Sequence, residues 1–594
     1  MAIRVADHIV NKIFDAGADS CFLVTGRGAL FLNDALARHD EINIVPVHHE
    51  QTAGFAAVSY ADKSGKPGFC MVSTGCAMTN ALTAVLNAWQ DGIPCIFVSG
   101  QNKLEETTHF TGMQIRTFGQ QEADIIPMVE SITKYAVMIT DPETVDEHIN
   151  EAIYQATTGR KGPVWIDVPL NVQNMRIEPE NGTHDVTPVS LPKASATEID
   201  RVVDSLKKAD RPLILIGSGI RSAEAVEEFQ DLVEHHQLPV VFSGSAVDTF
   251  GSTNPLSIGS VGIMGCTRAG NFALQNSDLL LVIGNRLTTM TTGEQLDKFA
   301  RRAKRIVVDI DENEHQKNDL RVDQFVHSDA NYFIEELSKA EALTPKKEWL
   351  DRLSYWKEYF DREGIIGGEE GPVDLHDLAR ELGHSMSDNA AIVTDSGLIE
   401  LVLPTNIPFK KGQRCIHPAS QGSMGYALPA VIGAHYAGVE QLITVIGDGS
   451  VMMNLQELAT IQFQKIPAKI FIVNNNAYAV IRKRQVQLFR NRTIGVDEQT
   501  GVGIPEFEKI AAGFDVPFKR INDTSELKDG LKEVLEMEGP VLCEIMGKPD
   551  QNYIHMTHAR TQEKRFVQRP LEDQSPFLDR DIFVREMIVE PIDQ

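Results

Sequence analysis

Short apolar runs alternate with segments of helical periodicity along most of this 594-residue chain. Runs of four to six residues with no polar face fit strands that are buried on both sides of a sheet. Strands separated by helices indicate βαβ units and therefore parallel sheets. The pattern predicts an α/β protein built from doubly wound parallel sheets.

The runs fall into three units of similar length, of which the first and the third look alike in size and pattern. The first unit, residues 1–172, has apolar runs at 21–25, 42–47, 68–73, 94–99 and 164–168. The second unit, residues 193–343, has them at 213–216, 240–243, 279–283 and 305–310. The third unit, residues 372–550, has them at 391–394, 442–446, 469–473 and 540–545. Two polar stretches, 173–194 and 344–371, are predicted linkers, and 551–594 is a predicted extended tail on a surface or a partner subunit.

Charge and cysteine content exclude several classes of function. With 83 acidic and 56 basic residues, the net charge of −27 disfavours binding to nucleic acid. The seven cysteines are scattered and form no CxxC pair, so neither a disulfide framework nor a zinc site is indicated. The N-terminal 20 residues predict an amphipathic helix rather than a signal peptide, and no apolar stretch is long enough to span a membrane. We expect a cytoplasmic protein with reduced thiols.

The sharpest local feature is the sequence Gly447-Asp448-Gly449-Ser450, which follows one apolar run and precedes a helical pattern at 452–463. The next apolar run ends in Asn474-Asn475-Asn476, so both segments are expected at carboxyl ends of neighbouring parallel strands, where open α/β sheets bind ligands. Aspartate and asparagine oxygens suit Mg²⁺, and the glycines let the backbone approach a phosphate. The arrangement predicts a diphosphate held through a divalent cation.

The stretch GDGSVMMNLQELATIQFQKIPAKIFIVNNN resembles the cofactor motif of thiamine diphosphate (ThDP) enzymes, within the acetolactate synthase-like group of 2-oxo acid decarboxylases and carboligases. VPVHHEQTAGFAAVSYA, GPVWIDVPLNVQ and HPASQGSMGYALPAVIGA are also similar to family segments. The resemblance implies that the three units are a pyrimidine-binding, a central Rossmann-like and a diphosphate-binding domain. It also implies a homodimer or homotetramer in which the cofactor lies between the first unit of one subunit and the third unit of another.

The resemblance also implies the roles of individual residues. The metal ligands are Asp448, Asn475 and the carbonyl of Ala477. Glu50 matches the glutamate that hydrogen-bonds the aminopyrimidine ring and promotes loss of the reactive thiazolium proton. Its position before a helix of small residues argues against a solvated surface charge. The remaining cofactor contacts implied are Asn80, Gln121, Ser423, Met424, Gly447, Gly449, Ser450 and Tyr478, with Met424 propping the cofactor.

The sequence differs from those of acetolactate synthases at the positions where those enzymes bind their acceptor substrate. Their acceptor arginine corresponds to Met290, which cannot form a bidentate pair with a carboxylate. Their pocket tryptophan corresponds to Arg484, near Val480, and the run from 482 to 484 is either a basic pocket mouth or a solvated helix face. These exchanges leave the cofactor residues intact and favour an acceptor other than pyruvate. Relatives that add a two-carbon branch to a nucleotide keto sugar are one such group.

Whether the central unit binds FAD, another nucleotide such as ADP, or nothing stays open. The residues that fall where acetolactate synthases contact flavin are Gly217, Gly219, Gly262, Gly284, Arg286 and Asp309. A lone GxG is weak evidence for a dinucleotide. The two aspartates of the family segment are replaced by Thr288 and Thr289, which speaks against flavin.

The sequence thus predicts a ThDP- and Mg²⁺-dependent carboligase or lyase that decarboxylates a 2-oxo acid, pyruvate first, and transfers the acyl-anion equivalent to an aldehyde or ketone. One alternative is an acetolactate synthase large subunit with a small regulatory partner. Another is a simple 2-oxo acid decarboxylase. A nucleotide-binding protein without catalysis is a third, against which the intact Glu50, Asp448 and Asn475 argue.

Overall fold

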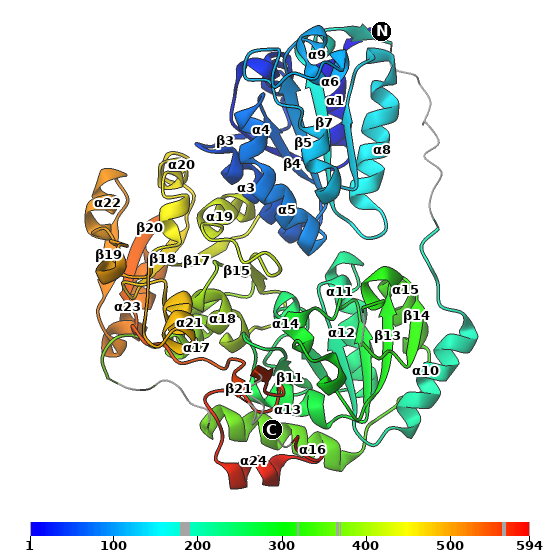
Figure 1. Ribbon diagram of the computed structural model, residues 1–594, viewed down its shortest axis with the longest axis vertical. Coiled ribbons are helices and arrows are strands. Elements are labelled where there is room, and N and C mark those ends of the chain that lie inside the picture. Colours follow the sequence, from blue (N-terminus) through cyan, green and yellow to red (C-terminus); the bar gives the residue numbers. More distant parts are fainter. Residues whose placement is uncertain are drawn as a thin grey trace.

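Parallel β-sheets form the centre of each of the three units in the computed structural model, which describes residues 2–178, 190–317, 320–363, 368, 370–560 and 566–592. Within these ranges the strands form three six-stranded sheets and two two-stranded pairs. All neighbours within the six-stranded sheets are parallel (Figure 1). The predicted fold class is confirmed. No described helix is long and apolar enough to cross a membrane.

The first unit has the strand order β3-β2-β4-β5-β7-β6. Its strands are β2 (Ser20–Leu23), β3 (Asn43–Pro46), β4 (Gly68–Val72), β5 (Cys95–Gln101), β6 (Tyr135–Met138) and β7 (Pro163–Pro169). Its helices are α1 (Val5–Asp15), α2 (Leu30–Ala37), α3 (Glu50–Ser64), α4 (Cys76–Asn80), α5 (Leu82–Asp91), α6 (Thr108–Thr111), α7 (Ile126–Val129), α8 (Val145–Thr157) and α9 (Leu170–Gln173). The amphipathic helix predicted at the N-terminus is α1, whose apolar face is buried.

The central unit has the order β11-β10-β9-β12-β13-β14, which is the 3-2-1-4-5-6 order of Rossmann folds. Its strands are β9 (Pro212–Ile216), β10 (Val240–Phe242), β11 (Ser257–Ser260), β12 (Leu279–Ile283), β13 (Lys304–Asp309) and β14 (Gln324–His327). Its helices are α10 (Ala196–Lys208), α11 (Gly219–Ser222), α12 (Val226–His236), α13 (Arg268–Asn276), α14 (Thr289–Thr292) and α15 (Ala330–Ser338).

The third unit has the order β16-β15-β17-β18-β20-β19, so numbered within each unit it repeats the 2-1-3-4-6-5 order of the first. Its strands are β15 (Ala390–Thr394), β16 (Arg414–Ile416), β17 (Gln441–Gly447), β18 (Lys469–Asn474), β19 (Phe518–Ile521) and β20 (Val541–Met546). Its helices are α17 (Leu375–Ser385), α18 (Leu398–Asn406), α19 (Ala427–Tyr436), α20 (Glu457–Phe463), α21 (Ala479–Leu488), α22 (Phe507–Gly513) and α23 (Thr524–Glu536). The likeness predicted between the first and third units is thus a shared topology.

The prediction of a linker at 344–371 is wrong for most of this stretch. The structure has a 17-residue helix, α16 (Lys347–Glu363), in this stretch. Trp349, Leu353, Trp356 and Phe360 recur at helical spacing and are at most 4% exposed, so the helix has a buried apolar face beneath its charged surface. Residues 364–367 and 369 lie outside the described residues.

The other predicted linker, 173–194, begins with structure of the first unit. Strand β8 (Arg176–Ile177) pairs antiparallel with β1 (Ile3–Arg4), which ties the end of the unit to its beginning. Residues 179–189 lie outside the described residues.

The C-terminal segment from residue 551 is extended in part, as predicted, and also contains regular structure. A two-stranded pair, β21 (His558–Arg560) with β22 (Phe566–Gln568), is followed by helix α24 (Arg580–Glu586). Met556, Leu571 and Phe583 are buried in the same core cluster as Trp356 of α16. In Figure 1 the segment (red) leaves the third unit and crosses to the central unit. We call residues 551–592 the tail.

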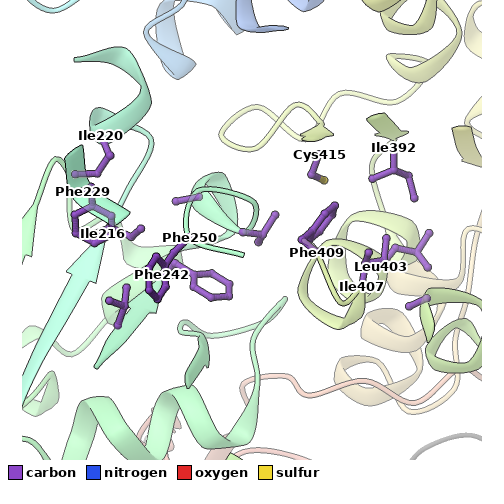
Figure 2. Close-up of a cluster of buried hydrophobic side chains, with 14 of the residues drawn as sticks. Ile216, Ile220, Phe229, Phe242, Phe250, Ile392, Leu403, Ile407, Phe409 and Cys415 are labelled. Carbon is purple, nitrogen blue, oxygen red and sulfur yellow. The ribbon is translucent and has the colours of Figure 1, made fainter. Parts of the chain in front are cut away.

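Apolar cores continue from one unit into the next. Figure 2 shows the cluster that joins the central unit to the third, with Phe250 on one side and Phe409 on the other. A second cluster joins the first and third units, where α3 packs against α19. A β-carbon at Gly433 would lie 2.0 Å from the Ala56 carbonyl oxygen, so the small residues let these two helices approach closely.

A buried arginine ties the three units together. The Arg414 guanidinium donates to the carboxylates of Asp248 in the central unit (2.8 Å) and Asp62 in the first (3.1 Å). Asp248 also accepts from Arg221 (2.9 Å). Although burial opposes the charge, these two arginines hold the pKa of Asp248 well below its usual range. The relative placement of the units is therefore fixed by charge pairs as well as by apolar packing.

Candidate active site

The three residues predicted as metal ligands come together at the carboxyl ends of β17 and β18. Asp448 follows β17 and is 3% exposed, and its carboxylate accepts hydrogen bonds from the backbone of Gly449 (2.7 Å) and Asn475 (3.0 Å). The Asn475 side-chain oxygen accepts from the backbone of Ala477 (3.1 Å). Burial raises the pKa of Asp448 to about 6, although these backbone bonds oppose the shift. One carboxylate with amide and carbonyl oxygens is a donor set that suits Mg²⁺.

A further acid organises this end of the site and was missed by the sequence analysis. Asp395, at the end of β15, is fully buried and accepts from the Ser450 hydroxyl and from the backbone of Gly425 (3.1 Å) and Ala427 (2.9 Å). Burial raises its pKa to about 6 against the effect of these bonds. It follows a predicted strand, 391–394, so the rule that selected Asp448 could also have selected Asp395.

The segment that follows the GDGS sequence differs from the prediction. Instead of a helix over 452–463, a 3-10 turn at Val451–Met453 comes first and α20 starts at Glu457. Asn454, between the two, donates to the carbonyl of Gly425 (2.8 Å) and to the side chain of Gln51 (3.0 Å). These bonds hold the turn against both the loop Gly422–Gly425 and the first unit, which explains why the helix starts late.

The loop from Gly422 to Gly425 carries the predicted contacts Ser423 and Met424. Gly425 has φ +78°, and a β-carbon there would lie 2.4 Å from that of Met453, so only glycine fits. The Ser423 hydroxyl is buried and has no hydrogen-bond partner among the described residues. A buried polar atom of this kind usually has a partner, which a bound group would supply. Beside the loop, the Tyr478 ring packs over Gly449, where a β-carbon would lie 1.9 Å from it.

The pyrimidine side of the predicted site lies at the carboxyl ends of the first sheet. Glu50 opens α3, and its carboxylate accepts a hydrogen bond from the Asn80 amide of α4 at 2.9 Å. The Gln121 carbonyl oxygen lies against Gly75, just before α4, where a β-carbon would be 1.7 Å away. Glu50 and Asn80 are therefore in direct contact, and the Gln121 backbone packs against the start of the helix that carries Asn80.

The first unit also contacts the third within one chain. The backbone of His48 donates to Glu457 (3.2 Å), and the Thr52 hydroxyl donates to Asn454 (3.4 Å). His48 and Thr52 lie on either side of Glu50 in the sequence, and Asn454 and Glu457 follow the GDGS sequence. In the described part of the chain, however, no hydrogen bond joins the Glu50 carboxylate itself to the third unit.

A cavity of about 710 Å³ lies where the three units meet and contains most of the predicted nucleotide residues. Gly217, Gly219, Gly284, Arg286 and Asp309 line it. Packing alone also requires glycine at 217 and 219, because a β-carbon at either position would lie 2.5 Å from the backbone of Gly284. Gly262 is the exception among the predicted residues.

Gly262 packs against the carbonyl oxygen of Met290, 2.5 Å from where a β-carbon would be, rather than lining the cavity. The Asp309 carboxylate is already paired with His315 at 3.1 Å. Glu400 also lines the cavity, and burial raises its pKa to about 8. The geometry provides space for a ligand of nucleotide size without selecting one.

The predicted acceptor residues lie on two elements that the tail connects. Met290, in α14, is 47% exposed, and its carbonyl accepts from the backbone of Ile263 (2.8 Å). The Ile263 carbonyl in turn accepts from the backbone of Met556 in the tail (2.6 Å). On the other side, Arg484 and Val480 lie on α21, which the tail contacts through Lys483 and Tyr553.

Comparisons with known proteins agree with this geometry. Three family models match: the N-terminal TPP binding domain of thiamine pyrophosphate enzymes at residues 3–128, their central domain at 199–337 and their C-terminal TPP binding domain at 395–545. The chain is 31% identical over 563 residues to the acetolactate synthase large subunit of Corynebacterium glutamicum, covering 92% of this chain and 87% of that protein.

Two further relatives are similar at the same level. Acetolactate synthase isozyme 1 large subunit of Escherichia coli is 30% identical over 541 residues, covering 91% of this chain and 93% of that protein. Acetolactate synthase 2, chloroplastic, of Zea mays is 30% identical over 565 residues, covering 92% and 86%. The family resemblance implied by the sequence is confirmed. The chain belongs to the thiamine pyrophosphate enzymes and is an acetolactate synthase-like member of that family.

Proposed function

We propose that the protein is a ThDP- and Mg²⁺-dependent carboligase that decarboxylates a 2-oxo acid, pyruvate first, and joins the remaining acyl unit to an aldehyde or ketone. The observation that carries the proposal is the gathering of Asp448, Asn475 and Ala477 at one sheet edge. The Asn80-bound carboxylate of Glu50, at the matching edge of a second sheet, adds to it. The relatives named acetolactate synthases support the reaction class.

The residues present fit the cofactor. The oxygen donors Asp448, Asn475 and Ala477 suit Mg²⁺, and the buried hydroxyl of Ser423, which has no partner among the described residues, is a polar atom that a bound group would satisfy. Gly447 has open space around its α-carbon, which lets a diphosphate approach the backbone. ThDP, when bound, supplies a carbon nucleophile for the carbonyl of the 2-oxo acid and takes up the electron pair that CO₂ leaves behind.

The residues of this chain then have separate tasks. Glu50 holds a proton at the pyrimidine ring, which promotes deprotonation of the cofactor. Asn80 fixes the orientation of that carboxylate through its 2.9 Å hydrogen bond. Asp395 positions Ser450 and the Gly425 backbone, so that the loop Gly447–Ser450 and the loop Gly422–Gly425 keep their relative placement.

The acceptor is proposed to differ from that of the acetolactate synthases. Met290 offers no charge for an acceptor carboxylate, whereas Arg484 adds a positive charge near the tail. A nucleoside diphosphate keto sugar has the carbonyl and the anionic groups that this arrangement suits. An acetolactate synthase large subunit and a simple decarboxylase are the alternatives.

The acceptor is tested by product analysis. We expect the enzyme with pyruvate and a nucleoside diphosphate keto sugar to release CO₂ and give an adduct larger by one C₂H₄O unit, detected by mass spectrometry. Arg484→Trp is expected to raise the KM for this acceptor about ten-fold or more, since a hydrogen bond to a charged group contributes roughly 1.5–3 kcal/mol. Acetolactate from pyruvate alone, with Arg484→Trp kinetics unchanged, would instead establish the synthase alternative.

The cavity at the junction of the units is proposed to hold a nucleotide, either FAD or a redox-inactive one such as ADP. Its volume of about 710 Å³ and the cation Arg286 support this proposal. No step of the reaction above needs it. We also propose a cytoplasmic location, in keeping with seven unpaired cysteines, six of them buried.

We propose further that the active site lies between two copies of the chain. Exposed apolar side chains flank both halves of the site, with Phe110 and Phe118 before Gln121 on one half. Met453 and Ile494, which are 50% and 78% exposed, lie on the other half. Apolar side chains gathered in this way mark an interaction surface.

Complementation tests this arrangement. A heterodimer of Glu50→Gln and Asp448→Asn chains, co-expressed and purified through two different tags, is expected to recover about half of the wild-type CO₂ release. The reason is that one of its two symmetry-related sites receives both native residues. Each homodimeric variant serves as the inactive control. A heterodimer as inactive as its parents would place both residues of one site on the same chain.

A further inference from the structure

Helix α21 and the tail meet through a group of basic and aromatic side chains. Lys483 lies over the Tyr553 ring, with its ammonium nitrogen 4.5 Å from the ring centroid. The rings of Tyr553 and His555 are 5.0 Å apart, and both residues are at most 4% exposed. The Nδ1 of His555 bonds to the Tyr553 carbonyl (3.0 Å), while its Nε2 is buried and unpaired among the described residues.

Positive charge in this group is only partly balanced by negative charge. Of the three consecutive basic residues, Arg482 forms ion pairs with the carboxylates of Asp550 (3.4 Å) and Asp497 (3.9 Å). In the described ranges, neither Lys483 nor Arg484 has a carboxylate within ion-pair distance. Burial, and then the charges of Lys483 and Arg484, lower the pKa of His555, although its bond to the Tyr553 carbonyl opposes the shift. The charge of Asp550 acts on Lys483 without forming an ion pair with it.

The group is close enough to the proposed reaction centre to hold part of a substrate. The Tyr478 ring packs over Gly449 of the loop Gly447–Ser450, and Lys483 comes five residues after Tyr478. At 1.5 Å per helical residue this places Lys483 about 8 Å further along the chain direction of α21. On its other side the tail reaches Met290 through Ile263. The basic group on α21 thus faces the tail, and the tail continues to the other predicted acceptor element, α14.

We propose that Lys483 and Arg484, facing Tyr553 and His555 of the tail, form an anion subsite that holds a phosphoryl group of the acceptor. Two full positive charges match a phosphoryl group, which carries about −1.5 to −2, better than they match a single carboxylate. An arginine fork additionally gives bidentate bonds to its oxygens. This inference rests on the proposed function, because it assigns the subsite to the acceptor of that reaction.

Phosphorus NMR of the enzyme loaded with Mg²⁺ and ThDP, titrated with inorganic phosphate, tests the subsite. Arg484→Gln and Lys483→Gln are each expected to weaken phosphate binding roughly ten-fold, and the double variant more, since each loses a charge-assisted hydrogen bond. Arg484→Lys keeps the charge but loses the bidentate geometry, so it should weaken phosphate binding less than Arg484→Gln does. The exposed Lys509→Gln, in α22 of the same unit, is the matched control for loss of charge.

Three outcomes would overturn the proposal. The first is unchanged phosphate binding in the double variant while the ThDP signals show a loaded, folded protein. The second is weaker binding in Arg286→Gln alone, which places the phosphate in the nucleotide cavity. The third is a phosphate-induced change in CO₂ release from pyruvate without an acceptor, which makes free phosphate a regulator. Loss of the ThDP signals from the native protein would instead refute the proposed function.

Discussion

Glu50→Gln is expected to lower CO₂ release from pyruvate by about 10²–10⁴-fold, the range that a positioned acid or base contributes. Glutamine keeps an oxygen that can accept the hydrogen bond from Asn80, so α4 and the start of α3 should stay in place. It cannot hold the proton through which the carboxyl group acts on the pyrimidine ring. The measurement is kcat for CO₂ release at saturating ThDP and Mg²⁺.

The matched control is Glu130→Gln, which removes an exposed carboxylate from the same unit. It is expected to leave kcat unchanged. ThDP binding, followed by calorimetry, should change only a few-fold in Glu50→Gln, because the diphosphate end of the proposed site is untouched. A Glu50→Gln enzyme with native kcat would show that another group activates the cofactor.

Asp448→Asn is expected to abolish the stabilisation that Mg²⁺ and ThDP together give the native protein. A ligand at 100 times its Kd stabilises a fold by about 2.7 kcal/mol, which appears as a rise in melting temperature. The variant loses the negative charge that would hold the cation, so its melting temperature should not respond. Asparagine can accept only one of the two backbone hydrogen bonds that the Asp448 carboxylate accepts, so the melting temperature of the variant is compared with and without the two ligands rather than with that of the native protein.

Asp550→Asn controls for the loss of an acidic residue, because the Asp550 side chain is 98% exposed. It should retain the full response to Mg²⁺ and ThDP. Omission of Mg²⁺ from the native protein is expected to reproduce the behaviour of Asp448→Asn. An Asp448→Asn protein that still gains stability from the two ligands together would remove this residue from the metal site.

The inner strands of all three sheets could be predicted from sequence, whereas five of the six edge strands could not. The missed strands are β6, β11, β14, β16 and β19, and each lies at the end of its sheet. Inner strands are buried on both faces and so appear as continuous apolar runs. An edge strand such as Arg414–Ile416 is short and carries a charge, because its sequence is set by neighbouring units rather than by its own sheet.

The same reason explains the helix α16 and the tail. Their apolar residues are spaced among charged ones. They form a core only when Trp356 and Phe583, more than 200 residues apart in the chain, both pack against Phe272. Asp448 and Asn475 could be selected as candidates because each follows a recognisable strand, and Glu50 because its segment resembles a family segment. Asp395 follows one as well, yet its role depends on partners at 425, 427 and 450 that only the fold brings together.

The most direct measurement for the central proposal is CO₂ release from a panel of 2-oxo acids, beginning with pyruvate, by protein reconstituted with ThDP and Mg²⁺. We expect CO₂ release to require both additions and to be lost in Glu50→Gln. No release from any 2-oxo acid, although calorimetry shows ThDP bound to the native protein, would contradict the proposed donor chemistry.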